Sequence, residues 1–167
     1  MKSMVVYDSR FGDTAQVARA IAEGLRASGG VELDAVQDAV AYDLDGVDLL
    51  VVGGPTHAHG LSDGLARWLA SLPRGVVEDR QVAAFDTRYR MVRIFSGSAA
   101  HTISRLLRRA GATAVAQPER FFVLASQGPL ADGELARATA WAEGLAARCS
   151  APLPSAAASG EHRRSHP

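Results

Sequence analysis

Residues 4–14 read Met-Val-Val-Tyr-Asp-Ser-Arg-Phe-Gly-Asp-Thr, a short apolar run followed by a polar turn that contains a glycine. The apolar run at 4–7 is typical of a buried β-strand. Residues 14–28 then carry apolar side chains at a helical spacing, and Gly29 and Gly30 follow as a stop signal. A strand that leads through a polar turn directly into a helix is typical of the first unit of a parallel α/β sheet.

The same alternation of strands and helices continues to about residue 149. Val31, Leu33 and Ala35 alternate with polar residues, which predicts a half-exposed edge strand. Elsewhere, wholly apolar runs predict buried strands, and apolar positions three and four residues apart predict amphipathic helices. The expected buried strands are 49–52, 82–85 and a last strand split over 112–116 and 121–125, and the expected helices are 65–72, 103–110 and 135–145.

Short apolar strands separated by helices favour parallel strand pairing with helices on both faces of the sheet. The spacing within residues 1–149 predicts an α/β domain with a doubly wound five-stranded parallel sheet of order 2-1-3-4-5. Ligands of such sheets bind outside the carboxyl ends of the strands, at the switch point between the first and third strands. The loops at 8–14, 54–62 and 86–97 are therefore where we expect a ligand site.

Length and composition predict one domain with a sizeable core. Of the 167 residues, 47% are hydrophobic and 22% are charged. We expect the domain to span 1–149, and the segment 150–167, rich in Pro, Ala and Ser, to be a disordered tail. The apolar runs are too short to cross a membrane and residues 1–8 lack the apolar stretch of a signal peptide, so we expect a cytoplasmic protein. Cys149 is the single cysteine, which excludes an intramolecular disulfide.

The net charge is zero, but the charges are unevenly placed along the chain. Residues 1–64 carry ten acidic against four basic residues, and residues 65–167 carry eight acidic against fourteen basic residues. A neutral chain has no general attraction for nucleic acid, so we expect no nucleic-acid partner. A basic patch near one expected helix is either an ordinary solvated face or a docking site for an acidic redox partner; it contains Arg105, Arg108, Arg109 and Arg120.

The loop at 8–14 has the chemistry of a phosphate site. Free backbone N–H groups and the positive end of the helix dipole lie at a helix N-terminus, and the hydroxyls of Ser9 and Thr14 add donors. Arg10 adds a cation, but the loop is neither a Walker loop nor a G-x-G-x-x-G dinucleotide loop. The alternative is a plain strand-to-helix turn, in which Gly12 serves the backbone conformation and Asp13 caps the helix.

Three stretches resemble the loops of the flavodoxin family. The stretch SRFGDT at 9–14 resembles the family's phosphate loop, S/T-x-x-G-N-T. The stretch VVGGPT at 51–56 is similar to the family's third strand and the G-x-P-T start of its second loop, and VAAFDT at 82–87 is similar to its fourth strand and third loop. The resemblance covers about 1–149 in the family's order, without the insertion of long-chain members. It implies a flavodoxin-like fold and a noncovalently bound FMN.

The resemblance also implies roles for individual residues. The loop at 9–14 would surround the FMN phosphate, and the other two loops would flank the flavin ring. Either histidine of the second loop could supply a proton as the flavin is reduced, because an imidazole titrates near neutrality. The implied cofactor contacts are Ser9, Arg10, Phe11, Gly12, Asp13 and Thr14 in the first loop, Pro55, Thr56, His57 and His59 in the second, and Asp86, Thr87, Arg88 and the stacking candidate Tyr89 in the third.

Departures from the family pattern bear on the cofactor. Asp13 replaces the usual Asn, and its carboxylate repels a phosphate unless Arg10 and the helix N-terminus offset the repulsion. The second loop has His57 and His59 where an aromatic residue commonly lies against the flavin. Flavodoxins that shuttle electrons are strongly acidic, whereas this chain is neutral. Basic residues near the third loop should favour the reduced, anionic flavin and raise its potential; they are Arg88, Arg90 and Arg93.

The resemblance leaves more than one function open. The main expectation is electron transfer to a redox partner protein or a small-molecule acceptor, by a monomer or homodimer, with no membrane as a partner. One alternative is an FMN-dependent NAD(P)H:quinone-type reductase, which would turn over NAD(P)H with an added quinone. The other is a flavodoxin-fold module that no longer binds FMN, with Asp13 as the lesion.

Two further patterns are better explained without catalysis. The stretch GLSDG at 60–64 fits the G-x-S-x-G of hydrolases, but it lies several residues beyond the strand that a nucleophile elbow requires. Ser62 or Asp63 is instead expected to cap the next helix. His57 and His59 have a spacing found in metal sites, but no second cluster of ligands accompanies them, so we expect no metal site.

Overall fold

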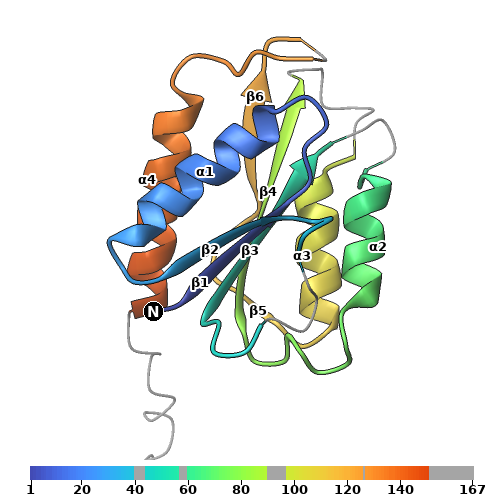
Figure 1. Cartoon of the computed structure of the whole chain (residues 1–167), viewed down its shortest axis with the longest axis vertical. Coiled ribbons are helices and arrows are strands. Elements are labelled where there is room, and N and C mark those ends of the chain that lie inside the picture. The colour runs from blue at the N-terminus through green and yellow to red at the C-terminus, as the bar shows by residue number, and fades with distance from the viewer. Residues whose placement is uncertain (40–43, 57–59, 90–96, 126, 151–167) are drawn as a thin grey trace, which may run out of the picture.

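The computed structural model describes residues 1–39, 44–56, 60–89, 97–125 and 127–150. They form three layers (Figure 1). One face of a parallel sheet is covered by α1 (Asp13–Arg26) and α4 (Glu134–Ser150), and the other by α2 (Asp63–Ser71) and α3 (Ala99–Arg109). The predicted α/β class is confirmed. The expected tail lies outside the described residues, except for Ser150, the last residue of α4.

The sheet has the order β2-β1-β3-β4, and both β5 and β6 pair with β4. These pairings are parallel, with β5 beside the start of β4 and β6 beside its end. Together β5 and β6 are the split last strand, so the predicted order 2-1-3-4-5 is confirmed. The strands are β1 (Ser3–Tyr7), β2 (Val31–Ala35), β3 (Leu49–Pro55), β4 (Gln81–Tyr89), β5 (Thr113–Ala114) and β6 (Glu119–Val123).

β4 is longer than the sequence predicts. The apolar run ends at Phe85, and the polar residues from Asp86 onward suggest a loop, but β4 continues to Tyr89. Asp86 and Thr87 are buried because the end of β3 lies on one side of them and β6 on the other. The expectation of a loop from Asp86 is therefore wrong: pairing with two neighbouring strands, rather than side-chain polarity, decides where β4 ends.

Two apolar clusters fill the space between the sheet and its helices. β1 contributes alternate residues to both clusters, as the period of two in a strand requires. Full burial of one such side chain stabilises the fold by about 1.5–3 kcal/mol. The cluster under α2 and α3 includes Met4, Val6, Leu50, Val52 and Ile103, and the cluster under α1 and α4 includes Val5, Ile21, Leu25, Phe85 and Phe121.

The start of α2 is set by the residue that directly precedes it. Ser62 is the N-cap of α2, and its hydroxyl oxygen accepts a hydrogen bond from the Leu65 N–H at 3.3 Å. The predicted capping role of the Ser62–Asp63 pair is thus confirmed for Ser62, and Asp63 is the first residue of the helix. None of the described helices is both long and apolar enough to cross a membrane.

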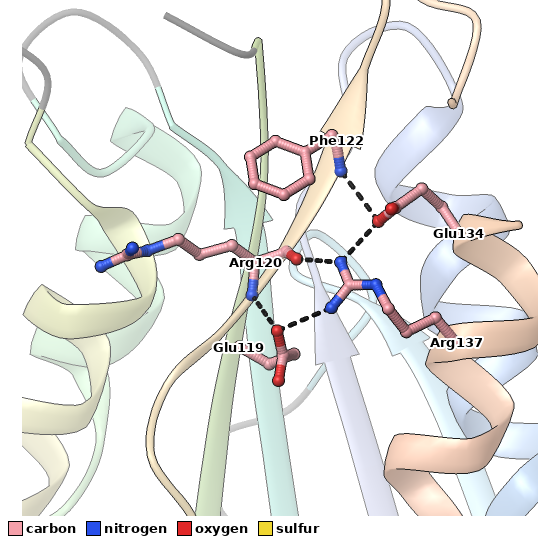
Figure 2. A network of polar contacts seen from close by, with 5 residues as sticks. All are labelled: Glu119, Arg120, Phe122, Glu134 and Arg137. Atoms are coloured by element: carbon pink, nitrogen blue, oxygen red, sulfur yellow. Dashed lines mark hydrogen bonds and ion pairs between the residues drawn. The ribbon is translucent and has the colours of Figure 1, made fainter. Parts of the chain in front are cut away.

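Side chains of α4 close the outer edge of β6 (Figure 2). The Arg137 guanidinium donates to the Glu119 carboxylate at 2.8 Å and to the carbonyl oxygen of Arg120. The Glu134 carboxylate accepts from the same guanidinium at 2.6 Å and from the Phe122 N–H at 3.0 Å. α4 is therefore joined to the last strand by hydrogen bonds as well as by apolar packing.

The remaining outward-facing backbone groups of β6 are also hydrogen-bonded. The Arg120 N–H donates to the Glu119 carboxylate at 3.0 Å, and the Phe122 carbonyl oxygen accepts from the Ala131 N–H at 2.8 Å. An edge strand ordinarily presents a row of free N–H and C=O groups to other chains. Here the N–H and C=O of both outward-facing residues have partners within the chain.

Candidate cofactor site

A cavity of about 280 Å³ lies at the carboxyl ends of the central strands. Its walls come from the loop after β1, from the end of β3, and from the ends of β4 and β6. This is the switch point between the first and third strands, where the sequence predicts a ligand. The cavity brings together nine of the predicted residues, Arg10, Phe11, Asp13, Thr14, Pro55, Thr56, Thr87, Arg88 and Tyr89, and adds Val123.

The loop before α1 exposes unpaired backbone donors. Gly12 is the N-cap of α1 and has a φ of 99°, a left-handed conformation that glycine adopts without steric cost. Gly12 is the N-cap and Asp13 is the first helical residue, so the interpretation of Asp13 as a cap is wrong. The N–H groups of Asp13 and Thr14 make no hydrogen bond to the residues that the structure describes. They are available to an anion at the positive end of the helix dipole.

Ser9 organises this loop from within. Its hydroxyl oxygen accepts hydrogen bonds from the N–H groups of Gly12 and Ala15, each at 3.2 Å. Ser9 does not line the cavity. The structure therefore gives the Ser9 side chain a role in shaping the turn, while the neighbouring residues form the cavity wall.

A pair of threonine hydroxyls lies on the floor of the cavity. The hydroxyl oxygens of Thr14 and Thr87 are 2.6 Å apart and buried. One hydroxyl donates to the other, so the accepting hydroxyl keeps its own hydrogen. That hydrogen is a further donor for a ligand oxygen at this end of the cavity.

The carboxylate of Asp13 lies between the cavity and the loop that joins β6 to α4. A Cβ atom on Gly128 would lie only 2.6 Å from the Asp13 Oδ2, so the carboxylate packs directly against the Gly128 backbone. Gly128 also has a φ of 90°. The negative charge of Asp13 thus lies at the rim of the cavity, beside a loop that a larger residue at 128 would displace.

Part of the cavity wall is apolar. Phe11 is 52% exposed and Tyr89 is 47% exposed, although both side chains are large and aromatic. Pro55 and Val123 contribute the rest of this apolar wall. The Arg10 guanidinium lies 5.4 Å from the centroid of the Phe11 ring. Exposed aromatic rings at the rim of a cavity are suited to stacking against a planar ligand.

Asp86 faces away from this cavity, toward α3. Its carboxylate accepts from the Ser98 hydroxyl at 2.7 Å and from the Ala100 N–H at 3.2 Å, and the side chain is completely buried. Asp86 therefore anchors the N-terminus of α3 and does not line the cavity. His57 and His59, expected on the other side of the ring, lie outside the described residues, as do Arg90 and Arg93.

Two residues near the site were not among those that the sequence singled out. Val123 lies at the end of β6 and completes the apolar wall. Asp8 follows β1, and its carboxylate accepts a hydrogen bond from the Ser62 hydroxyl, which joins the first loop to the start of α2. Each of these residues lies at the carboxyl end of a strand, and this position could have identified it as a candidate from the sequence. Within the described residues, no three His, Cys, Asp or Glu side chains cluster as metal ligands.

Comparison with known proteins identifies the family. The sequence profile described as "Flavodoxin domain" matches residues 4–93, more than half of the chain, and this region includes the loop before α1 and the ends of β3 and β4. The chain belongs to the flavodoxin family. Membership in the flavodoxin family implies a flavin cofactor.

Two flavodoxins match part of the chain. A flavodoxin from Clostridium saccharobutylicum is 32% identical over 92 residues, which are 52% of this chain and 56% of the relative. A flavodoxin from Aquifex aeolicus (strain VF5) is 39% identical over 69 residues, which are 40% of this chain and 35% of the relative. This chain therefore spans about half or less of the length of these flavodoxins.

Solved flavodoxin structures share the fold over nearly the whole chain. A flavodoxin from the domain Archaea superposes with a TM-score of 0.76 at 20% identity, covering 90% of this chain and 100% of that one. Oxidised Flavodoxin 2 from Bacillus cereus also gives a TM-score of 0.76 at 20% identity, covering 89% of this chain and 99% of that one. These likenesses establish the flavodoxin fold.

Proposed function

We propose that this chain binds FMN noncovalently in the cavity at the strand ends and carries electrons between redox partners. FMN supplies the redox chemistry when bound, because its ring accepts and returns electrons. The observation that carries the proposal is the pair of unpaired N–H groups, on Asp13 and Thr14, at one end of a cavity with an apolar aromatic wall. Family membership favours an electron carrier over a reductase or a module without cofactor.

The polar end of the cavity suits a phosphate group. Two backbone N–H groups, the Arg10 guanidinium and the spare hydrogen of the Thr14–Thr87 pair provide donors of partial or full positive charge. The Asp13 carboxylate opposes them with one negative charge. Charge-assisted hydrogen bonds from N–H groups and guanidinium to phosphate are roughly twice as strong as neutral ones, and we expect these donors together to outweigh the single carboxylate.

The apolar end suits the flavin ring. Tyr89 and Phe11 offer aromatic faces, and Pro55 and Val123 exclude water from the contact. Arg88 lines the same cavity. A guanidinium in a site of reduced dielectric stabilises negative charge on its ligand. We therefore expect a midpoint potential above those of strongly acidic flavodoxins, which a redox titration with FMN measures.

The test is a pair of titrations on the purified protein, following the quenching of FMN and of riboflavin fluorescence. Riboflavin has the same ring and lacks the phosphate, so it isolates the contribution of the loop before α1. We expect FMN to bind at least about tenfold more tightly than riboflavin. Equal binding of the two would overturn the phosphate assignment, and quenching of neither would overturn the proposed function. NADH or NADPH oxidation with an added quinone would reveal a reductase.

A further inference from the structure

A second groove, of about 1180 Å³, runs along α3 and is closed on its other side by residues 112–118. We call it the α3 groove. Its lining contains three arginines, Arg105, Arg108 and Arg109, together with His101. No Asp or Glu occurs among its lining residues in the described part of the chain. The groove therefore has a positive wall with no acidic residue to balance it.

The arginines of the α3 groove have no ionic partner elsewhere among the described residues. Each of the three is exposed, and none belongs to an ion pair in that part of the molecule. Arg108 and Arg109 lie in the last turn of α3, where a positive charge is favourable at the negative end of the helix dipole. Arg105 lies in the middle of α3, where the helix dipole does not stabilise its charge. Its charge is left for a ligand outside the chain.

The basic side chains follow one side of the helix. His101, Arg105 and Arg109 are four residues apart, which places them in one row along α3 with a length of about 12 Å. A row of this length matches carboxylates spaced along a helix or strand of another protein. A small anion would meet only one or two members of the row.

The end of the α3 groove at the N-terminus of α3 adjoins the candidate cofactor site. Ser98 lines the groove and donates a hydrogen bond to Asp86 of β4. The next residue, Ala99, donates its N–H at 3.0 Å to the hydroxyl of Thr56, which lines the cavity. Two consecutive residues thus connect the groove to the cavity wall. A partner bound along α3 would therefore reach the cofactor site at the N-terminal end of the helix.

We propose that the α3 groove docks an acidic protein that exchanges electrons with the bound flavin, an inference that rests on the proposed function. An acidic protein fits better than a nucleic acid for two reasons. The chain is neutral overall, with a strongly acidic N-terminal part, so it does not attract a long polyanion from a distance. The lining also contains no Phe, Tyr or Trp among its described residues, whereas single strands bind by stacking on such rings.

The test uses a short, fluorescently labelled oligoglutamate peptide as the acidic probe, with binding followed by anisotropy at low ionic strength. The groove variant combines Arg105→Glu and Arg109→Glu. The matched control combines Arg19→Glu and Arg67→Glu, two exposed helical arginines outside the groove with the same change in charge. We expect the groove variant to bind the probe about tenfold more weakly than the control. Arg105→Gln is a milder variant that keeps the helix end unchanged, and its smaller loss should have the same direction.

Several outcomes would overturn the docking proposal. They are an equal loss of binding in the groove variant and the control, tighter binding of a short RNA oligonucleotide than of the oligoglutamate peptide, or self-association that disappears in the groove variant. FMN titrations on the same proteins separate this proposal from the proposed function. If FMN binds but probe binding does not depend on the groove, the docking proposal fails and the proposed function stands. If probe binding depends on the groove but FMN does not bind, the proposed function fails.

Discussion

The hydroxyl oxygens of Thr14 and Thr87 lie 2.6 Å apart, in a buried contact between the first turn of α1 and the end of β4. Two of the three loops expected to form the site are therefore joined by a single hydrogen bond. The bond fixes the start of α1, with the N–H groups of Asp13 and Thr14, relative to the end of β4.

Replacing Thr87 with Val should destabilise the protein, because it leaves the Thr14 hydroxyl buried without a partner. We expect the free energy of unfolding to fall by about 1–2 kcal/mol, measured by urea denaturation. The double variant with Thr14→Val should cost less than the sum of the two single changes, since both partners are then apolar. Thr113→Val, at an exposed position of β5, is the control. Additive costs in the double variant would show that the hydroxyls do not interact.

The Asp13→Asn change should strengthen FMN binding. It removes the only carboxylate among the described residues that line the cavity and keeps the size of the side chain. The expected gain is about fivefold in affinity, from the loss of a like-charge interaction near a partly exposed surface. Riboflavin binding should stay the same. Asp63→Asn makes the same change at the first residue of α2 and should leave FMN binding unaltered; a similar gain there would indicate a general charge effect.

Arg10→Met should weaken FMN binding by about tenfold without changing riboflavin binding, because the lost cation belongs to the loop that we propose holds the phosphate. Fluorescence quenching with both ligands measures the difference. Arg26→Met, at the other end of α1, removes the same charge from an exposed ion pair with Glu23 and serves as the control. A loss of riboflavin affinity as large as that for FMN would place Arg10 against the ring.

Arg137→Met should loosen the contact between α4 and β6. Burial alone would lower the pKa of Arg137, but its hydrogen bonds to Glu134 and Glu119 outweigh that effect and raise the pKa. A raised pKa keeps this guanidinium charged in the folded protein, so its stabilising effect is lost only at extreme alkaline pH. We expect the substitution to lower the free energy of unfolding by about 2 kcal/mol, since the largely buried Glu134 then lacks its cation. Arg148→Met in the same helix should have a much smaller effect in urea denaturation.

Cys149 should react slowly with iodoacetamide in the folded protein. Burial, with a smaller contribution from Asp48, raises the pKa of the Cys149 thiol. The thiolate is the reactive form, so at mildly alkaline pH the folded chain should react more slowly than the same chain unfolded in urea. Because the raised pKa disfavours ionisation in the fold, stability should decline as the pH rises past the value of a free thiol. Equal rates in both states would show that Cys149 is freely accessible.

Much of the fold could be predicted from the sequence because it depends on local patterns. The buried face of α1, with Val17, Ile21 and Leu25, follows directly from helical spacing. Not every apolar residue of the later helices is buried: Leu106 is 37% exposed and Leu135 is 42% exposed. Their position on a helix was predictable, but how much of each helix the sheet covers depends on the assembled layers.

The candidate site shows the same limit. Arg10 and Thr14 were predictable because a loop between a strand and a helix has known chemistry. The orientation of Asp86 was not, because it depends on β4 continuing as a strand and sending alternate side chains to opposite faces. Ser9 was placed in the right loop, but only the three-dimensional turn reveals that its hydroxyl bonds to the loop's own backbone.

The closed outer edge of β6 has a consequence for how this molecule meets its neighbours. Both the N–H and the C=O of Arg120 and Phe122 are already bonded within the chain. A strand from another molecule finds no free donor or acceptor on these two residues with which to continue the sheet along β6. Association along β6 must therefore proceed through side chains, whose identity evolution can change without rebuilding the sheet.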